Sequence, residues 1–192
     1  MSYLLQNSAL LIFGANPKAY PPVVSGTLQL FDGQLSVSHI SLLTVACCLV
    51  IMVGLTLFTG RTRMGKAMRA CSEDKGAAEL MGINVDTTIS VTFAIGSGLA
   101  AIAGVLYLSA YPNLVPTTGS MPGIKAFTAA VFGGIGSIPG AFLGGILLGV
   151  IEILGKAYIS TELSDAIVFA VLIIVLLIKP TGLLGKKINE KV

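Results

Sequence analysis

The sequence has little of what a water-soluble domain of its size needs. Charged side chains make up only 11% of its 192 residues, there is one histidine and no tryptophan, and long stretches carry no charge at all. Hydrophobic residues account for 54% of the chain, and its mean hydropathy is +0.90. A chain this apolar is typical of a protein that lies within a bilayer. Its basic residues stand between apolar runs and form no stripe interleaved with aromatics, which argues against a nucleic-acid partner.

Cysteine is also scarce. Cys47 and Cys48 are neighbours within an apolar run, where they would point about 100° apart on a helix, and Cys71 stands alone among basic residues. This pattern predicts neither a disulfide framework nor a metal site. Residues 60–66, GRTRMGK, have the spacing of a phosphate-binding loop, but Ala67 replaces the hydroxyl that would bind Mg²⁺, and no strand leads in. We therefore expect no cofactor and no nucleotide site in this chain.

Four apolar regions predict the architecture. Residues 39–59 and 89–111 are uncharged and long enough to cross ~30 Å of hydrocarbon as helices. A third region, 126–156, contains GGIGSIPG at 133–140, and glycine and proline at that density should interrupt the helix. The fourth, 165–178, is shorter and is flanked by charges. The sequence thus predicts an all-α membrane protein, a polytopic helical bundle that forms a single transmembrane domain over residues 1–192.

The basic residues predict which side each loop faces. Nine of the twelve Lys and Arg residues lie in the linker 60–88 or in the tail 179–192. Both segments should therefore be cytoplasmic by the positive-inside tendency. An even number of crossings must separate them, so we expect the broken segment 126–156 to enter and leave on the same side, as two re-entrant half-helices over 126–132 and 141–156. Such irregular backbone is tolerated where protein covers it or where it lines a watery path.

By the same parity, residues 16–38 are extracytoplasmic. Leu28 and Leu30 alternate with polar residues, and Asp32-Gly33 suits a tight turn, so this loop should contain a small β-hairpin. Residues 1–15 are apolar but short and lack the basic start of a signal peptide. We expect them to be the end of a membrane helix whose beginning is missing.

The cytoplasmic linker predicts a short helix. Ser72 can cap its start and Gly82 can end it, which predicts a helix over residues 73–81. A helix of this length is marginal in water, so other contacts must hold it. Two interpretations are open: a surface loop that packs on its own membrane domain, or a docking element for a cytosolic partner. The apolar contacts of such a docking element would be Ala77, Ala78, Leu80 and Met81.

Several motifs in these regions resemble a known family. GAAELMG, residues 76–82, is similar to the Ala-Ala-x3-Gly core of the cytoplasmic coupling loop in permeases of ATP-binding-cassette importers. RACSEDKGAAELMGINVD at 69–86, KAFTAAVFGGIGSIPGAFLGGILLGVIE at 125–152 and DAIVFAVLIIVLLIKPTGLLG at 165–185 resemble the LivH-type permeases of branched-chain amino acid uptake. The resemblance covers essentially the whole chain.

The resemblance implies a permease subunit in the bacterial inner membrane, with its C-terminus in the cytoplasm. In this family two membrane subunits form the pathway, two ATP-binding subunits dock on the cytoplasmic loops and hydrolyse ATP, and a periplasmic binding protein delivers leucine, isoleucine or valine. The residues that the motif assigns to ATPase coupling are Arg69, Asp74, Lys75, Ala77, Ala78 and Gly82. This chain departs from the family in having Gly76 where the motif opens with an acidic residue, and in matching permeases without their N-terminal third.

A substrate path through the broken segment is a further expectation. A transported amino acid is zwitterionic, and a half-helix starting near Ala141 would present backbone amides to its carboxylate. The candidate path residues are Gly133, Gly134, Gly136, Pro139, Gly140 and Glu152. The alternatives are that GGIGSIPG only makes a tight turn against a neighbour, and that Glu152 forms a structural pair with Lys156, four residues later.

Two other functions compete with the importer subunit. A secondary transporter or channel would be expected to place carboxylates or histidine at mid-membrane, and residues 39–59 and 89–111 contain none there. A truncated membrane paralogue that does not transport is the other alternative.

Overall fold

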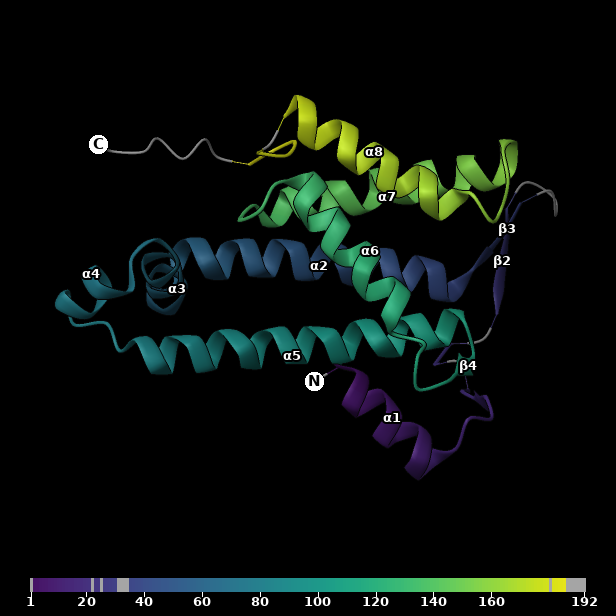
Figure 1. The fold of residues 1–192 in the computed structure, drawn as a ribbon, viewed down its shortest axis with the longest axis horizontal. Coiled ribbons are helices and arrows are strands. Elements are labelled where there is room, and N and C mark those ends of the chain that lie inside the picture. Colours follow the sequence, from purple (N-terminus) through teal and green to yellow (C-terminus); the bar gives the residue numbers. More distant parts are fainter. Residues whose placement is uncertain (1, 22, 25, 31–34, 180, 186–192) are drawn as a thin grey trace. The chain divides into compact units, whose positions relative to one another are not determined.

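The computed structural model describes residues 2–21, 23–24, 26–30, 35–179 and 181–185. The chain divides into two compact units, Met1–Gly119 and Ser120–Val192, each with its own packing. α-Helices dominate both units, and the strands that the structure describes are short (Figure 1). The prediction of an all-α membrane protein built from a helical bundle is therefore confirmed.

Three helices form most of the N-terminal unit: α1 (Ser2–Phe13), α2 (His39–Arg61) and α5 (Val85–Ala110). α2 and α5 contact each other and run side by side in Figure 1. Both are long and apolar enough to cross a membrane, and they cover the segments predicted as helices over 39–59 and, to within one residue, 89–111. α5 begins four residues earlier than predicted because Asn84 caps it: the side-chain Oδ1 of Asn84 accepts a hydrogen bond from the backbone N–H of Thr87 at 3.0 Å.

Short antiparallel strands pair within this unit: β1 (Lys18–Ala19) with β4 (Asn113–Leu114), and β2 (Thr27–Leu30) with β3 (Leu35–Ser38). The β2–β3 pair, with Leu28 opposite Val37, confirms the predicted hairpin, whose turn at Asp32-Gly33 lies outside the described residues. The sequence did not predict the β1–β4 pair, because two-residue strands carry no readable alternation. This pair joins the chain that follows α1 to the chain that follows α5.

Three helices form the C-terminal unit: α6 (Ser120–Gly133), α7 (Ile138–Tyr158) and α8 (Ser164–Ile178). The helix is interrupted inside GGIGSIPG, as predicted, but both flanking helices are longer than expected. α6 begins at Ser120 because Pro122 lies in its first turn, where a missing N–H costs nothing. α7 begins at Ile138 because the Oγ of Ser137 accepts a hydrogen bond from the N–H of Gly140 at 3.1 Å. Its 21 residues are long and apolar enough to cross a membrane, and the helix extends beyond the half-helix predicted over 141–156 at both ends.

Close backbone contacts hold α6 against α7. A methyl group on Gly133 would collide with the carbonyl oxygen of Gly140, and one on Gly144 would collide with the carbonyl oxygen of Ala129. Small residues allow this approach, which is the usual means of packing helices in lipid. The buried core of the unit takes one apolar side chain from each helix: Phe132, Leu148 and Val168.

The turn between α6 and α7 is covered by the segment that follows α8. The N–H of Leu183 donates to the carbonyl oxygen of Phe132 at 3.0 Å, and the N–H of Leu184 donates to that of Gly133 at 2.9 Å. A side chain on Gly134 would collide with the backbone of Gly185. The turn therefore lies at the end of the unit where α8 finishes, and residues 181–185 satisfy carbonyl groups that the end of α6 leaves open.

We expect Gly144→Val to destabilise the C-terminal unit by about 1–3 kcal/mol, because the added methyl groups have no room beside the α6 backbone. Gly149→Val is the matched control on the same helix, since a Cβ there meets no atom within 4 Å. Thermal unfolding of the purified variants in detergent measures both effects. Equal unfolding temperatures for the two variants would contradict the α6–α7 contact.

Candidate functional site

The linker between α2 and α5 folds into two short helices, α3 (Arg63–Glu73) and α4 (Lys75–Leu80). The carboxylate of Asp74 caps α4, accepting hydrogen bonds from the N–H groups of Gly76 at 2.8 Å and Ala77 at 3.1 Å. Ser72 lies instead in the last turn of α3 and donates to the carbonyl oxygen of Arg69. The single helix predicted over 73–81 with a Ser72 cap is therefore wrong. A carboxylate that satisfies two open N–H groups and faces the positive end of the helix dipole makes Asp74 the stronger cap.

A small apolar core holds α4 in place. Ala78 of α4 is only 3% exposed and packs with Cys71 of α3 and Val85 of α5. Gly82 follows α4 with φ +81°, and the N–H of Ile83 donates back to the carbonyl oxygen of Ala78 at 3.0 Å. These contacts explain how a helix of six residues is stable, and they connect α4 directly to α3 and α5.

The outer side of α4 is uncovered. Leu80 is 90% exposed and Met81 is 82% exposed, and we call this pair the coupling tip. The polar residues around it that the family motif assigns to ATPase coupling, Arg69, Asp74 and Lys75, are exposed as well, as are Ala77 and Gly82. Ala78, which the motif also assigns to coupling, is buried and packs against residues of α3 and α5. None of the ion pairs in the part of the chain that the structure describes involves the linker.

The candidate path residues of the broken segment lie mostly inside the covered turn. Gly133, Gly134 and Gly140 are buried, and Gly136 is exposed. The N–H of Ala141, expected to face a substrate carboxylate, donates to the carbonyl oxygen of Ser137 within the first turn of α7. Pro139, in that same turn, has no N–H to offer. This geometry supports the alternative that GGIGSIPG is a tight turn against its neighbours.

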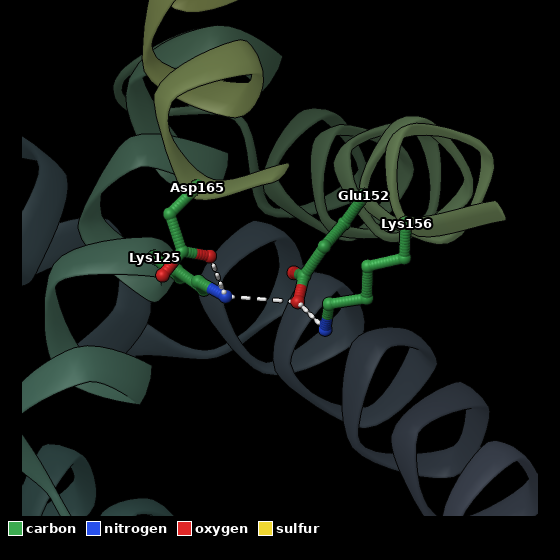
Figure 2. Close-up of polar contacts among 4 residues, drawn as sticks. All are labelled: Lys125, Glu152, Lys156 and Asp165. Carbon is green, nitrogen blue, oxygen red and sulfur yellow. Dashed lines mark hydrogen bonds and ion pairs between the residues drawn. The ribbon is translucent and has the colours of Figure 1, made fainter. Parts of the chain in front are cut away.

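Charged side chains from all three helices of the C-terminal unit meet in one place, and we call them the four-charge cluster: Lys125 of α6, Glu152 and Lys156 of α7, and Asp165 of α8. Figure 2 shows the Nζ of Lys125 between the two carboxylates, 2.9 Å from Glu152 Oε1 and 2.7 Å from Asp165 Oδ1. The Nζ of Lys156 contacts the same Oε1 atom, as the four-residue spacing predicts. Two positive and two negative groups give the cluster no net formal charge.

The sequence did not lead us to expect Lys125 as a site residue, or an ion pair between Lys125 and Asp165. The available signal was that Lys125 is a single charge in a long uncharged stretch, and an isolated charge at such a position needs a partner. The cluster lies at the end of the unit where α8 begins, since Asp165 is in the first turn of that helix. The covered turn lies at the opposite end, where α8 finishes. Ion pairs thus connect the helices of the C-terminal unit at one end, and backbone hydrogen bonds connect its segments at the other.

Comparison with known proteins adds an independent observation. Residues 3–176 match the protein-family model described as the branched-chain amino acid transport system / permease component. The chain is similar over its full length to the high-affinity branched-chain amino acid transport system permease proteins LivH of Escherichia coli (strain K12), at 48% identity, and BraD of Pseudomonas aeruginosa, at 45% identity. The alignments cover 63% and 64% of these relatives, so the chain spans less than two thirds of their length.

A more distant similarity is to a permease that is named for a different substrate. The fructose import permease protein FrcC of Rhizobium meliloti is 28% identical over 142 residues, which are 70% of this chain and 39% of that protein. No solved structure matches the chain.

Removing the ammonium group that joins the three helices should destabilise the C-terminal unit. In a Lys125→Met variant the carboxylates of Glu152 and Asp165 lose their shared partner, and we expect a loss of about 1–3 kcal/mol. The double variant Lys125→Met/Asp165→Asn should recover part of this loss because it removes one of the two like charges. Thermal unfolding in detergent measures both, with Lys66→Met, an exposed lysine of α3, as the control. Unfolding temperatures that coincide for all four proteins would show that the cluster does not hold the helices.

Proposed function

Because this chain belongs to the family of branched-chain amino acid transport system permease components, we propose that it is a membrane-spanning permease subunit of an ATP-binding-cassette importer. Its substrates are leucine, isoleucine and valine, and its membrane is the bacterial inner membrane. The chain itself is no enzyme, and separate ATP-binding subunits hydrolyse ATP. A second permease subunit and a periplasmic amino-acid-binding protein complete the importer. The observation that carries this proposal is the coupling tip, an uncovered apolar pair on a helix that is rigidly packed from behind.

The packing of α4 suits a mechanical role. A flexible methionine and a leucine at the tip fit an apolar groove on an ATP-binding subunit. Movement of that subunit during ATP hydrolysis pushes on α4, and the core of Cys71, Ala78 and Val85 passes the displacement to α3 and α5. α5 continues from this core as a 26-residue helix across the membrane. Because α4 is packed against α5, a push on the coupling tip tilts α5. This tilt opens the transport pathway alternately to the two sides of the membrane.

The basic residues support a cytoplasmic position for this linker and for the C-terminus. If the linker is cytoplasmic, the chain runs outward along α5, inward along α6, outward along α7 and inward along α8. The C-terminal tail is then cytoplasmic. The helices α6 and α7 then enter and leave from the outer side. In this topology the covered turn is cytoplasmic, whereas the four-charge cluster is extracytoplasmic.

A secondary transporter is the weaker reading of the same structure. It would need a carboxylate that is free to exchange a proton or an ion within the membrane. Glu152 and Asp165 are each held by lysine, and Glu152 by two. The other alternative is a truncated paralogue that does not transport. Measuring amino acid uptake in cells that lack the intact permease distinguishes it from an importer subunit.

We expect Leu80→Asp and Met81→Asp to abolish docking without unfolding the chain. Each places a charge in the proposed apolar groove of the ATP-binding subunit, but neither side chain contributes to the core behind α4. Co-purification with the ATP-binding subunits and leucine uptake should both fall by about tenfold or more. Glu79→Gln, a neighbouring exposed position, is the control. Undiminished uptake in both aspartate variants would remove the docking role.

The proposed orientation predicts which side of the membrane a labelling reagent reaches. Cys71 is buried, so the accessible probe is Ser72→Cys in a background where Cys47, Cys48 and Cys71 are serine. In spheroplasts an impermeant maleimide should modify this cysteine after permeabilisation and not before. Thr117→Cys, exposed in the segment between α5 and α6, is the control that should react from outside. Labelling of Ser72→Cys in intact spheroplasts would invert the topology and with it the proposed function.

A further inference from the structure

The four-charge cluster has hydrogen-bonding capacity that its internal contacts leave open. Both lysines converge on a single oxygen, Glu152 Oε1, and Lys125 reaches Asp165 through Oδ1. These ion pairs therefore use one oxygen of each carboxylate. Lys156 has three donor hydrogens but contacts one acceptor, and its side chain is 44% exposed. The cluster can therefore accept from a further ammonium group and donate to a further carboxylate without losing its present ion pairs.

The neighbouring residue shows unmet capacity of the same kind. Ser164, which precedes Asp165, is fully buried, and its Oγ has no hydrogen-bond partner in the part of the chain that the structure describes. Buried polar groups almost always have a hydrogen-bond partner, so a buried hydroxyl without one is unusual at this end of the unit.

The charge balance of the cluster selects the kind of ligand that suits it. Two lysines and two carboxylates already compensate each other, so a cation or an anion would leave an unpaired charge in a partly buried site. A zwitterion adds one charge of each sign and preserves the balance. Its ammonium group would contact the second oxygens of Glu152 and Asp165, and its carboxylate would contact Lys156. A ligand with a single charge can make only one of these two contacts.

An apolar surface adjoins the cluster on α7. Ile153 precedes Lys156 by three residues, which places the two on the same side of the helix. Its side chain is 67% exposed, so an aliphatic side chain of a bound ligand can lie against it.

From these observations we propose that Lys125, Glu152, Lys156 and Asp165 form a binding site for the zwitterionic head group of an α-amino acid with an aliphatic side chain. This inference rests on the proposed function and deepens it, because it locates where the permease itself contacts its substrate. Lys125 positions the two carboxylates, and Lys156 is the exposed group that binds the ligand carboxylate.

Three molecules of nearly the same size test the requirement for both charges. The purified chain is reconstituted in phosphatidylglycerol nanodiscs, whose lipid has no ammonium group and so cannot occupy the site as a zwitterion. Binding of radiolabelled leucine is measured by scintillation proximity, with unlabelled leucine, 3-methylbutylamine and 4-methylpentanoate as competitors. The amine lacks the carboxylate of leucine, and the acid lacks its ammonium group. We expect each analogue to compete about tenfold more weakly than leucine or worse, the effect of losing one charge-assisted contact.

Substitutions at Lys156 separate binding from folding. Lys156→Met removes the exposed ammonium group but leaves Lys125 between Glu152 and Asp165, so the three helices stay joined. Leucine affinity should fall about tenfold at an unchanged unfolding temperature. Lys156→Arg keeps the charge and should retain most of the affinity, and Lys66→Met, remote from the cluster in sequence, should behave like the wild type.

The outcomes distinguish this inference from the proposed function. Equal competition by all three molecules, or unaltered leucine affinity in Lys156→Met, would overturn the zwitterion site. Leucine uptake by the assembled importer together with no leucine binding to this chain would overturn the site and leave the proposed function intact. Leucine binding that is lost in Lys156→Met, together with no uptake by any assembled complex, would support the site and overturn the importer.

Discussion

The structure depends on one constraint, which is that a polar group within hydrocarbon must find its partner inside the chain. Hydroxyl groups along the two long helices of the N-terminal unit satisfy it locally. Thr56 Oγ1 donates to the carbonyl oxygen of Met52 at 2.7 Å, and Ser97 Oγ donates to that of Phe93 at 2.8 Å, each one turn back along its helix. In the C-terminal unit, charged side chains pair between helices, at the end where α8 begins. Because lipid tails are as apolar as leucine, such polar contacts and close glycine packing, more than apolar contact as such, determine which helices stay together.

The same constraint explains the difference between the two units. The linker of the N-terminal unit folds outside the apolar spans, where water satisfies charged side chains and a small core of Cys71, Ala78 and Val85 is enough to fix α4. The C-terminal unit has no such long polar linker within its described residues. Its helices are joined by ion pairs at one end, a core of Phe132, Leu148 and Val168, and backbone hydrogen bonds at the other end. One unit thus offers an exposed surface for a partner, and the other a compact arrangement of charges.

The sequence predicted the long elements because uncharged length and glycine-proline density are local signals. These signals predicted α2, α5, the β2–β3 hairpin and the interruption before α7. The sequence missed what depends on distant residues. Ser72 and Asp74 are both common N-cap residues, and the sequence did not show that the carboxylate of Asp74 would accept from two N–H groups of α4 while Ser72 ends α3. Lys125 and Asp165 stand forty residues apart, so nothing in either neighbourhood indicates the other. The turn at GGIGSIPG suggested a path, and nothing near it in the sequence indicated its cover, residues 181–185, which come two helices later.

That cover also sets an order of events during synthesis. The carbonyl groups of Phe132 and Gly133 accept hydrogen bonds from Leu183 and Leu184, which leave the ribosome some fifty residues later, after all of α7 and α8. Until then these carbonyl groups lack the donors that they have in the complete unit. The hairpin of α6 and α7 can therefore be completed only after translation has passed Leu184.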